Sequence, residues 1–406
     1  MCKDEKPTPD TESKLLVAKI REQERTRARN ELMNGLYDLL ETEKAPVAEW
    51  WIHPGDRGVE PLYLPDERCI LRQQGVPFAQ CCWEANRRQI DTFWTAEEVQ
   101  TDGDVREIAR AVDAAERAEQ TGEPIPDGVL TPAQLECVYA FLAFFAGSDF
   151  IVAANNARLQ TIVKNTEFVT VMATFGFMEN IHSDAYSRLV EALVPAARQQ
   201  EILRAVYDRP TVSSMAKWAQ KWMNSAAYPL AEQIMAFVIV EGVFFSGPFC
   251  VFFWLKKQGH LLTGACKVNE FIAGDEAGHA DYGCHVLNDH IVNRPTTERA
   301  HQMFREGTNL AEALVVDAIP VPDLGINAGT MVQYIRYVAD YWLVQTGYPK
   351  LYHATQPFDF IKSMCDFNRD QKSNFFEDAN NRAYRSAPGC DTPVGECSFS
   401  GEGVEF

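Results

Sequence analysis

The stretch 178–186, MENIHSDAY, places three chemically active side chains at helical spacing. Glu179 lies three residues before His182, and Tyr186 lies about one further turn along the chain. Residues at i, i+3 and i+7 share one stripe of a helix, so a carboxylate, an imidazole and a phenol would point the same way. The flanking residues are mostly apolar, which predicts that the stripe faces the protein interior. A carboxylate buried beside a histidine is costly unless something compensates its charge, and a metal ion is the usual compensator.

A second Glu-x-x-His pair, Glu276–His279, occurs in a similarly apolar helical context. Chance has to be weighed, because 57 acidic residues and 8 histidines in 406 positions give roughly one acidic-x-x-His match at random. A third pair, Glu298–His301, has polar flanks, and a threonine before it can cap a helix. We interpret that third pair as the solvated first turn of a helix.

Each of the two apolar pairs is preceded by a helical stretch with one isolated carboxylate. Asp149 lies 30 residues before Glu179, and Glu241 lies 35 residues before Glu276. Four carboxylates and two histidines that converge inside a four-helix bundle are the ligand set of a ferritin-like dimetal carboxylate site. The predicted metal ligands are Asp149, Glu179, His182, Glu241, Glu276 and His279.

Hard oxygen ligands with a minority of imidazole suit iron or manganese, and two such ions would balance the buried negative charge. Each residue taken alone could have an ordinary structural role. Asp149 could cap or bond to a neighbouring helix, His182 could be a satisfied core histidine, and Glu241 could pair with an arginine elsewhere. One metal site accounts for all six positions more simply than six unrelated roles.

Composition narrows the class of protein. The net charge of −19 and the pI of about 4.9 argue against a nucleic-acid partner or an anionic membrane surface. The 11 cysteines are scattered without a Cys-x-x-Cys pair, which indicates a reduced intracellular protein rather than a disulfide framework or a zinc site. The amino terminus lacks the apolar region of a secretory signal, so we expect a cytoplasmic protein.

One apolar stretch, residues 235–255, is long enough to span a bilayer and carries a single charge. Glu241, Gly242, Gly247 and Pro248 lie inside it, and it is the only stretch of its kind that we identify. A helix that is apolar all round can equally be the central helix of a large bundle. We therefore expect a buried core helix and no membrane association.

The chain reads as helical almost throughout from Thr95 onward, with no convincing alternating strands, which predicts an all-α fold. A capping box at Thr95–Glu98 is expected to open one helix, and Thr131, with Pro132 at the first helical position, to open the next. Residues 46–90 carry turn signals and are expected to be irregular. The further predicted helices are 196–224, 230–256 and 265–292.

We expect three regions along the chain. Residues 1–45 form a charged, partly disordered N-terminal extension, and residues 46–385 form the ferritin-like dimetal domain. Residues 386–406 are rich in Gly, Pro and Ser, which is typical of a flexible tail.

At these motifs the sequence resembles the small, radical-generating subunit of class I ribonucleotide reductases. The resemblance runs from about Glu60 to Tyr384. Segments that carry it include FWTAEEV (93–99), AFFAGSDFIV (143–152), MENIHSDAYS (178–187), VEGVFFSGPF (240–249) and NEFIAGDEAGH (269–279).

The resemblance implies two iron ions per chain, one held by Asp149, Glu179 and His182 and the other by Glu241, Glu276 and His279; manganese also suits these ligands. It implies that Tyr186 is oxidised to a stable radical. It also implies that Phe245, Phe249 and Ile272 line the radical pocket, where they would exclude water and reductants.

The family's nucleotide chemistry takes place on a separate large subunit, so the radical has to leave this chain. The resemblance implies a transfer chain through His182, Asp275 and Trp94, in which the aspartate links the histidine to the indole. It implies a tail tyrosine, Tyr384, that passes the radical onward. It further implies docking on the large subunit through Phe399 and Phe406, and a homodimer.

The chain departs from the family pattern at two places. Position 274 is glycine where the pattern has an arginine directly before the Asp–Glu pair. If that arginine helps to position the transfer chain, Asp275 lacks this support here. The spacing from Glu377 to Tyr384 is about one residue longer than the pattern expects. Asp149 rather than a glutamate, together with Tyr186, favours the di-iron tyrosyl form of the site over the manganese–iron form.

The preferred function is therefore the small subunit of ribonucleoside-diphosphate reductase, which supports DNA precursor synthesis. A di-iron oxidase or desaturase needs an open pocket beside the metals, which Phe245 and Phe249 are expected to fill. An iron-storage protein of ferritin type needs neither Trp94 nor the tail. A degenerate homologue with a regulatory role is supported only by Gly274.

Overall fold

The computed structural model describes residues 62, 71, 77–222, 227–258, 261–319 and 326–361, and leaves out the side chains of Pro77 and Phe150. All of these residues belong to the first of two units, Met1–Asn368; the second is Arg369–Phe406. The predicted extension, 1–45, and the predicted tail, 386–406, lie outside the described residues, as do Tyr384, Phe399 and Phe406. The three predicted regions of the chain therefore stay predictions.

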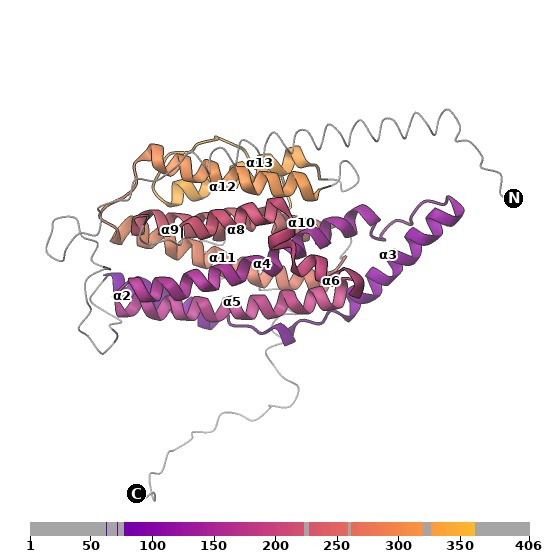
Figure 1. Ribbon diagram of the computed structural model, residues 1–406, viewed down its shortest axis with the longest axis horizontal. Helices are drawn as coiled ribbons and strands as arrows, with labels where there is room; N and C mark the ends of the chain where they lie inside the picture. Colours follow the sequence, from indigo (N-terminus) through magenta and orange to yellow (C-terminus); the bar gives the residue numbers. More distant parts are fainter. Residues whose placement is uncertain are drawn as a thin grey trace, which may run out of the picture. The chain divides into compact units, whose positions relative to one another are not determined.

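The regular elements in the described part of the chain are all helical, which confirms the predicted all-α fold (Figure 1). Helix α4 packs along α5, and α11 packs against α5, α9 and α10. The bounds of this four-helix core are α4 (Pro132–Ile162), α5 (Thr166–Leu193), the run α9 (Leu230–Ile239), η3 (Val240–Phe244) and α10 (Ser246–Lys257), and α11 (Thr263–His285).

Further helices surround this core. Helix α2 packs against α5 and α11, and the pair α12 and α13 packs against η3 and α10. The bounds are α2 (Pro77–Asp91), η2 (Ala96–Glu98), α3 (Asp102–Thr121), α6 (Ala196–Leu203), α7 (Ala205–Asp208), α8 (Pro210–Trp222), η4 (Val286–His290), α12 (Thr297–Ala318) and α13 (Ala328–Gln345).

Two predicted helix starts are confirmed. The Thr131 side chain accepts a hydrogen bond from the Gln134 amide at 3.2 Å, and the Gln134 side chain accepts one from the Thr131 amide at 2.9 Å. This capping box, with Pro132 in the first turn, begins α4. At α12 the Thr296 side chain accepts from the Arg299 amide, so the polar pair Glu298–His301 does lie in the first turns of a helix.

Three sequence predictions of local structure are wrong. Residues 77–91 form helix α2 rather than irregular chain, because Phe78, Ala79 and Cys82 form an apolar stripe that is buried in the core. The capping box at Thr95 makes only the single turn η2, since Val99 already has extended backbone (φ −107°, ψ 122°). The predicted helix 196–224 is divided into α6, α7 and α8.

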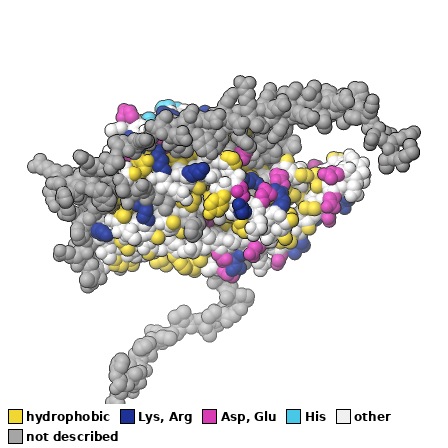
Figure 2. Space-filling model, in the orientation of Figure 1, with side chains coloured by type: hydrophobic (Ala, Val, Ile, Leu, Met, Phe, Trp, Pro, Cys, Tyr) yellow, Lys and Arg dark blue, Asp and Glu magenta, His cyan; other side chains and the backbone are white. Residues whose placement is uncertain are grey.

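The long apolar helices are core elements of the bundle. Pro132–Ile162 and Leu230–Lys257 are long and apolar enough to cross a membrane by length and composition, but 65% and 94% of their most apolar windows are buried inside the protein. Figure 2 shows where charge is exposed instead, with acidic and basic side chains interspersed over α3. The apolar helices are thus covered by other parts of the chain, and both carry predicted metal ligands.

Candidate metal centre

The six predicted ligands come from the four core helices and are all buried, with at most 1% of any residue exposed. Helix α4 supplies Asp149 and η3 supplies Glu241. The two Glu-x-x-His pairs lie on α5 and α11, where the i, i+3 spacing points each glutamate and its histidine the same way. The structure therefore brings all six side chains into the interior of one bundle.

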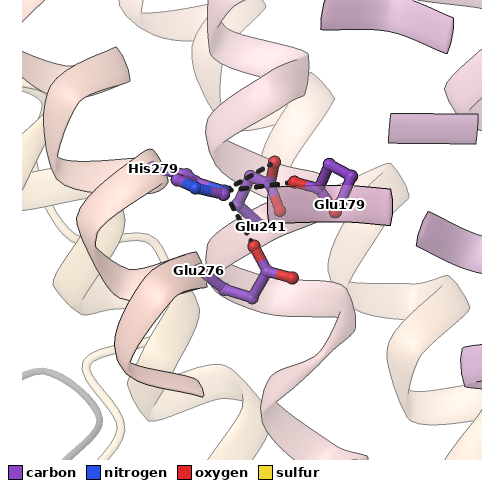
Figure 3. Close-up of side chains that lie close together, drawn as sticks. All are labelled: Glu179, Glu241, Glu276 and His279. Carbon is purple, nitrogen blue, oxygen red and sulfur yellow. Dashed lines mark ion pairs between the residues drawn. The ribbon is translucent and has the colours of Figure 1, made fainter. Parts of the chain in front are cut away.

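His279 is surrounded by three carboxylates (Figure 3). Its Nδ1 atom lies 2.9 Å from Glu276 Oε2, 3.2 Å from Glu179 Oε1 and 3.8 Å from Glu241 Oε1. One ligand atom from each of these four residues lies within 4.8 Å of the others. Among the described residues, the charged neighbour of Glu241 is this histidine rather than an arginine.

His182 faces two of the same carboxylates from the other side. Its Nδ1 atom lies 3.2 Å from Glu276 Oε1 and 3.5 Å from Glu179 Oε2. Glu179 and Glu276 thus each direct one oxygen to each histidine. Asp149 is close enough to Glu179, His182 and Glu276 for their charges to affect its own ionisation. Glu179 and Glu276 are thus placed so that they could be shared between cations bound beside the two histidines.

The donor atoms that face this centre have no hydrogen-bond partner. Apart from the ion pairs described above, both carboxylate oxygens of Asp149, Glu179, Glu241 and Glu276 are buried without a hydrogen-bond partner, as is Nδ1 of both histidines. Unpaired buried groups of this kind are strongly destabilising unless a ligand satisfies them. Eight carboxylate oxygens and two imidazole nitrogens are therefore a donor set that fits a pair of metal ions.

The protonation of the metal-free centre points to the same conclusion. Burial raises the pKa of Asp149 and of Glu241 well above the usual carboxyl value, and the neighbouring glutamates raise it further. Burial alone would lower the pKa of His182 and His279, but the surrounding carboxylates raise it well above the ordinary imidazole value. Metal ions that bind at this centre would therefore have to displace protons that these raised pKa values favour.

The second ring nitrogen of each histidine has its own partner. His182 Nε2 lies 3.1 Å from Asp275 Oδ2, which also accepts a hydrogen bond from Trp94 Nε1 at 2.9 Å. His279 Nε2 lies 3.1 Å from Gln89 Oε1. These contacts fix the ring orientations and direct both Nδ1 atoms to the centre. They also place the predicted chain of His182, Asp275 and Trp94 in continuous hydrogen-bond contact.

Gly274 does not leave Asp275 unsupported. The other oxygen of Asp275 accepts a hydrogen bond from Gln89 Nε2 at 2.8 Å, so the carboxylate is held from α2, from Trp94 and from His182. Gln89 bridges the second partners of both histidines. Sequence reasoning had no signal for Gln89, because it lies on a helix that the turn-rich composition of residues 46–90 concealed.

Tyr186 lies in an aromatic pocket beside the centre. Its ring stacks on Phe145 with centroids 4.4 Å apart and planes at 6°, and Phe145 in turn contacts Phe245 and Phe249 at 6.0 and 5.3 Å. Ile272 is fully buried on α11. Burial raises the pKa of Tyr186 well above its usual value, so its phenol stays protonated.

Two residues of this pocket were missed by sequence reasoning although a signal existed. Phe145 lies one turn before Asp149 on α4, and Asn269, which accepts a hydrogen bond from the Tyr186 hydroxyl, lies two turns before Glu276 on α11. Both therefore share the helical stripe of a predicted ligand. Neither is a charged or metal-binding type, which is why a search for metal ligands passed over them.

Glu241 lies on a π-helical segment, η3, rather than on regular α-helix. Such bulges free backbone carbonyls and are frequent at functional sites. The Gly242 carbonyl accepts a hydrogen bond from Trp342 Nε1 at 3.1 Å, and the Val243 carbonyl accepts one from Ser246 at 2.7 Å. A Cβ atom at Gly242 would lie only 2.4 Å from Trp342 Nε1, so the indole approaches because this position is glycine.

Comparison with known proteins gives a consistent result. A family model described as ribonucleotide reductase, small chain, matches residues 127–357. The ribonucleoside-diphosphate reductase small chain of Nicotiana tabacum is 36% identical over 324 residues, which cover 78% of this chain and 89% of the relative.

Solved structures share the fold. The ribonucleotide reductase Rnr4 homodimer of Saccharomyces cerevisiae has a TM-score of 0.64 at 23% identity and covers 74% of this chain and 89% of its own. The dimanganese(II) NrdF of Streptococcus sanguinis has a TM-score of 0.55 at 15% identity, with 72% and 98% covered. At these identities the likeness supports the ferritin-like fold alone.

Proposed function

Because the chain belongs to the ribonucleotide reductase small-chain family, we propose that it is the radical-generating subunit of ribonucleoside-diphosphate reductase. In this proposal a radical formed on Tyr186 is relayed to a separate large subunit, which reduces ribonucleotides to deoxyribonucleotides. The observation that carries it is the buried centre of unpaired carboxylate oxygens and imidazole nitrogens beside Tyr186.

Two metal ions would be held by the six predicted ligands. His182 and Asp149 would serve one ion, His279 and Glu241 the other, and Glu179 and Glu276 would be shared between them. Bound at this centre, the ions would supply the activation of O2 that oxidises Tyr186. These ligands suit both iron and manganese. We favour iron, because Asp149 and Tyr186 match the di-iron pattern.

The protein's own contribution is to protect and position the phenol of Tyr186. The rings of Phe145, Phe245 and Phe249 fill the space around it, which keeps out water and reducing agents. The same packing argues against an oxidase or desaturase, since such an enzyme needs room for an organic substrate beside the metals. Ile272 is fully buried on α11, seven residues before the ligand His279.

Transfer out of the subunit would use the hydrogen bonds between His182, Asp275 and Trp94. Asp275 accepts from both rings, so a proton can shift along these bonds while an electron moves between the metal side and the indole. Trp94 is itself buried, but the adjacent Phe93 is 43% exposed, which sets the end of this path close to the surface. Tyr384, Phe399 and Phe406 would continue the path and dock the tail on the large subunit.

We further propose a homodimer in the cytoplasm. The fold neighbour Rnr4 is a homodimer, and helix α5 leaves Phe177 53% exposed, which offers apolar surface to a second copy. Sedimentation of the purified chain would test directly whether it forms a dimer.

The catalytic proposal is tested by combining the metal-loaded chain with a class I large subunit and measuring formation of 2′-deoxynucleoside diphosphates. We expect activity that requires both chains and that disappears in Trp94→Phe, which lacks the indole N–H. Trp83→Phe, on the neighbouring helix α2, is the matched control and should stay active. Reduction that proceeds without the large subunit, or that survives loss of Trp94, would contradict the proposed path.

A further inference from the structure

The hydroxyl of Tyr186 has a single hydrogen-bond partner among the described residues. It donates to Asn269 Oδ1 at 3.2 Å. Both residues are fully buried, and Asn269 lies on α11 seven residues before Glu276, on the stripe that carries the metal ligands. The partner of the phenol is therefore a neutral amide from the opposite helix rather than one of the carboxylates.

The orientation of this amide is fixed by a second contact. Asn269 Nδ2 donates to the backbone carbonyl of Ala265 at 2.8 Å, one turn earlier on the same helix. Rotating the amide by half a turn would set its oxygen against that carbonyl and its NH2 group against the hydroxyl of Tyr186. The hydrogen-bond network therefore assigns the oxygen, an acceptor only, to the side of the phenol.

A hydrogen-bond acceptor beside the Tyr186 oxygen stabilises the phenol but not the phenoxyl radical. The phenol donates its O–H and gains the bond, whereas a phenoxyl radical has no hydrogen to donate and loses it. Oxidation of Tyr186 would remove one electron and the hydroxyl proton, and the metal ions that the six ligands would hold would supply the oxidising power. An amide oxygen is too weak a base to keep the proton, so a carboxylate near the phenol, Asp149, Glu179 or Glu276, would have to take it. The contact with Asn269 thus favours the reduced form.

We propose that Asn269 is a positioning residue that fixes the Tyr186 hydroxyl by accepting its hydrogen bond and makes the radical a stronger oxidant. This rests on the proposed radical role of Tyr186. In this account the surrounding phenylalanine rings protect the radical from reduction, and no hydrogen bond to the radical stabilises it. Its oxidising strength is set in part by an amide on α11.

The test compares Asn269→Leu, which has a similar shape but no acceptor, with Asn269→Asp, which keeps an oxygen at the same place. In the metal-free proteins, ultraviolet resonance Raman spectra of Tyr186, taken as the difference from Tyr186→Phe, should show a donating phenol. We expect that marker in the parent protein and in Asn269→Asp, and its loss in Asn269→Leu. A parent phenol that does not donate would overturn the proposal.

In the metal-loaded proteins, decay of the tyrosyl signal by a small phenolic reductant should be about two- to ten-fold slower in Asn269→Leu than in the parent, the factor that one neutral hydrogen bond contributes. In Asn269→Asp it should be at least as fast as in the parent. An unchanged or faster decay in Asn269→Leu contradicts the proposal. If Asn269→Leu fails to fold, the Raman spectrum of the parent protein and the decay in Asn269→Asp still decide.

High-field EPR separates the two orientations of the amide. With the oxygen fixed toward Tyr186, the gx value of the radical should be that of a phenoxyl without a hydrogen-bond donor, and equal in the parent and in Asn269→Leu. A lower gx in the parent that rises in Asn269→Leu would mean that the NH2 group faces the radical, which overturns the proposed role. If the parent forms no tyrosyl signal, the proposed function fails, while the Raman result still reports on the hydrogen bond.

Discussion

Tyr186 and Tyr282 occupy corresponding places in the two halves of the metal centre, yet their surroundings differ. Tyr186 follows His182 by four residues on α5, and Tyr282 follows His279 by three residues on α11. Both side chains are buried, and burial raises the pKa of each phenol well above its usual value. The number of residues between each tyrosine and its neighbouring histidine therefore does not distinguish Tyr186 from Tyr282.

The side chains that contact the two tyrosines do distinguish them. Tyr186 meets the flat face of Phe145 and a fixed amide oxygen, neither of which can give up a hydrogen atom readily. The hydroxyl of Tyr282 lies 3.1 Å from the thiol of Cys82. A thiol is an oxidisable neighbour, so we expect a radical at Tyr282 to be less persistent than one at Tyr186. In the proposed function, the inert surroundings of its phenol would therefore favour Tyr186 over Tyr282 as the site of a stored radical.

The two histidines differ in a parallel way. His182 is bonded to the carboxylate of Asp275, which continues to Trp94, whereas His279 is bonded to the neutral amide of Gln89. Gln89 in turn donates to Asp275, so His182 reaches Asp275 and Trp94 directly, whereas His279 reaches them through one further residue. The half that holds Tyr186 thus has the shorter hydrogen-bonded route to Trp94.

The largest expected effect is loss of the centre that both tyrosines flank. Glu276→Ala removes the carboxylate that faces both histidines, so we expect metal bound per chain to fall from about two ions to less than one. Elemental analysis after gel filtration measures this. Glu298→Ala, in the surface Glu-x-x-His pair on α12, is the matched control and should keep its full metal content. An equal loss of metal in both variants would show that the buried pairs are not the metal-binding site.

The next effect sharpens the comparison of the two histidines. Removal of a partner of a ligand histidine typically weakens metal binding or activity about 10–100-fold. We expect Asp275→Ala to reach the upper end, because it disconnects His182 from Trp94, and Gln89→Leu to stay near the lower end. Deoxynucleotide formation with the large subunit and metal affinity are the two readouts. A larger loss in Gln89→Leu would reverse the roles that we assign to the two halves.

A third prediction concerns pH. In the metal-free chain the pKa values of His182 and His279 are raised by the carboxylates around them, so both rings stay protonated below those pKa values. Metal ions have to displace these protons. Affinity should therefore fall as pH decreases, by about ten-fold per pH unit for each proton released. Calorimetric titration in buffers of different ionisation enthalpy gives the proton count, and metal uptake without proton release would contradict the description of the centre.

The smallest effect is expected at the thiol beside Tyr282. Cys82→Ala leaves the buried hydroxyl of Tyr282 without its partner, which should lower the free energy of unfolding by about 1–3 kcal/mol and leave the yield of the Tyr186 radical unchanged. Denaturant unfolding and EPR measure the two quantities. A marked change in the radical signal would show that Tyr282 and Cys82 communicate with the centre.

Much of the core could be predicted from the sequence, because two i, i+3 pairs and two isolated carboxylates in apolar helices are hard to bury without a metal site. The helical spacing of these residues and their apolar flanks also predicted that they are buried and that the fold is all-α. Gln89 was not predicted, because the short apolar stripe of helix α2 follows a turn-rich stretch and glutamine is not a typical metal-binding residue. The π-helical segment at Glu241 has a carbonyl that accepts a hydrogen bond from Trp342, 100 residues away from Gly242, and a contact at that separation is not encoded in the local sequence.

The central claim, that the buried centre oxidises Tyr186 and not its counterpart, is tested most directly by one EPR experiment. The metal-free parent, Tyr186→Phe and Tyr282→Phe proteins are each loaded with Fe(II), exposed to O2 and frozen, with the iron content measured on the same samples. We expect about two irons per chain in all three, a tyrosyl signal in the parent and in Tyr282→Phe, and none in Tyr186→Phe. A signal that survives in Tyr186→Phe but vanishes in Tyr282→Phe would contradict the claim.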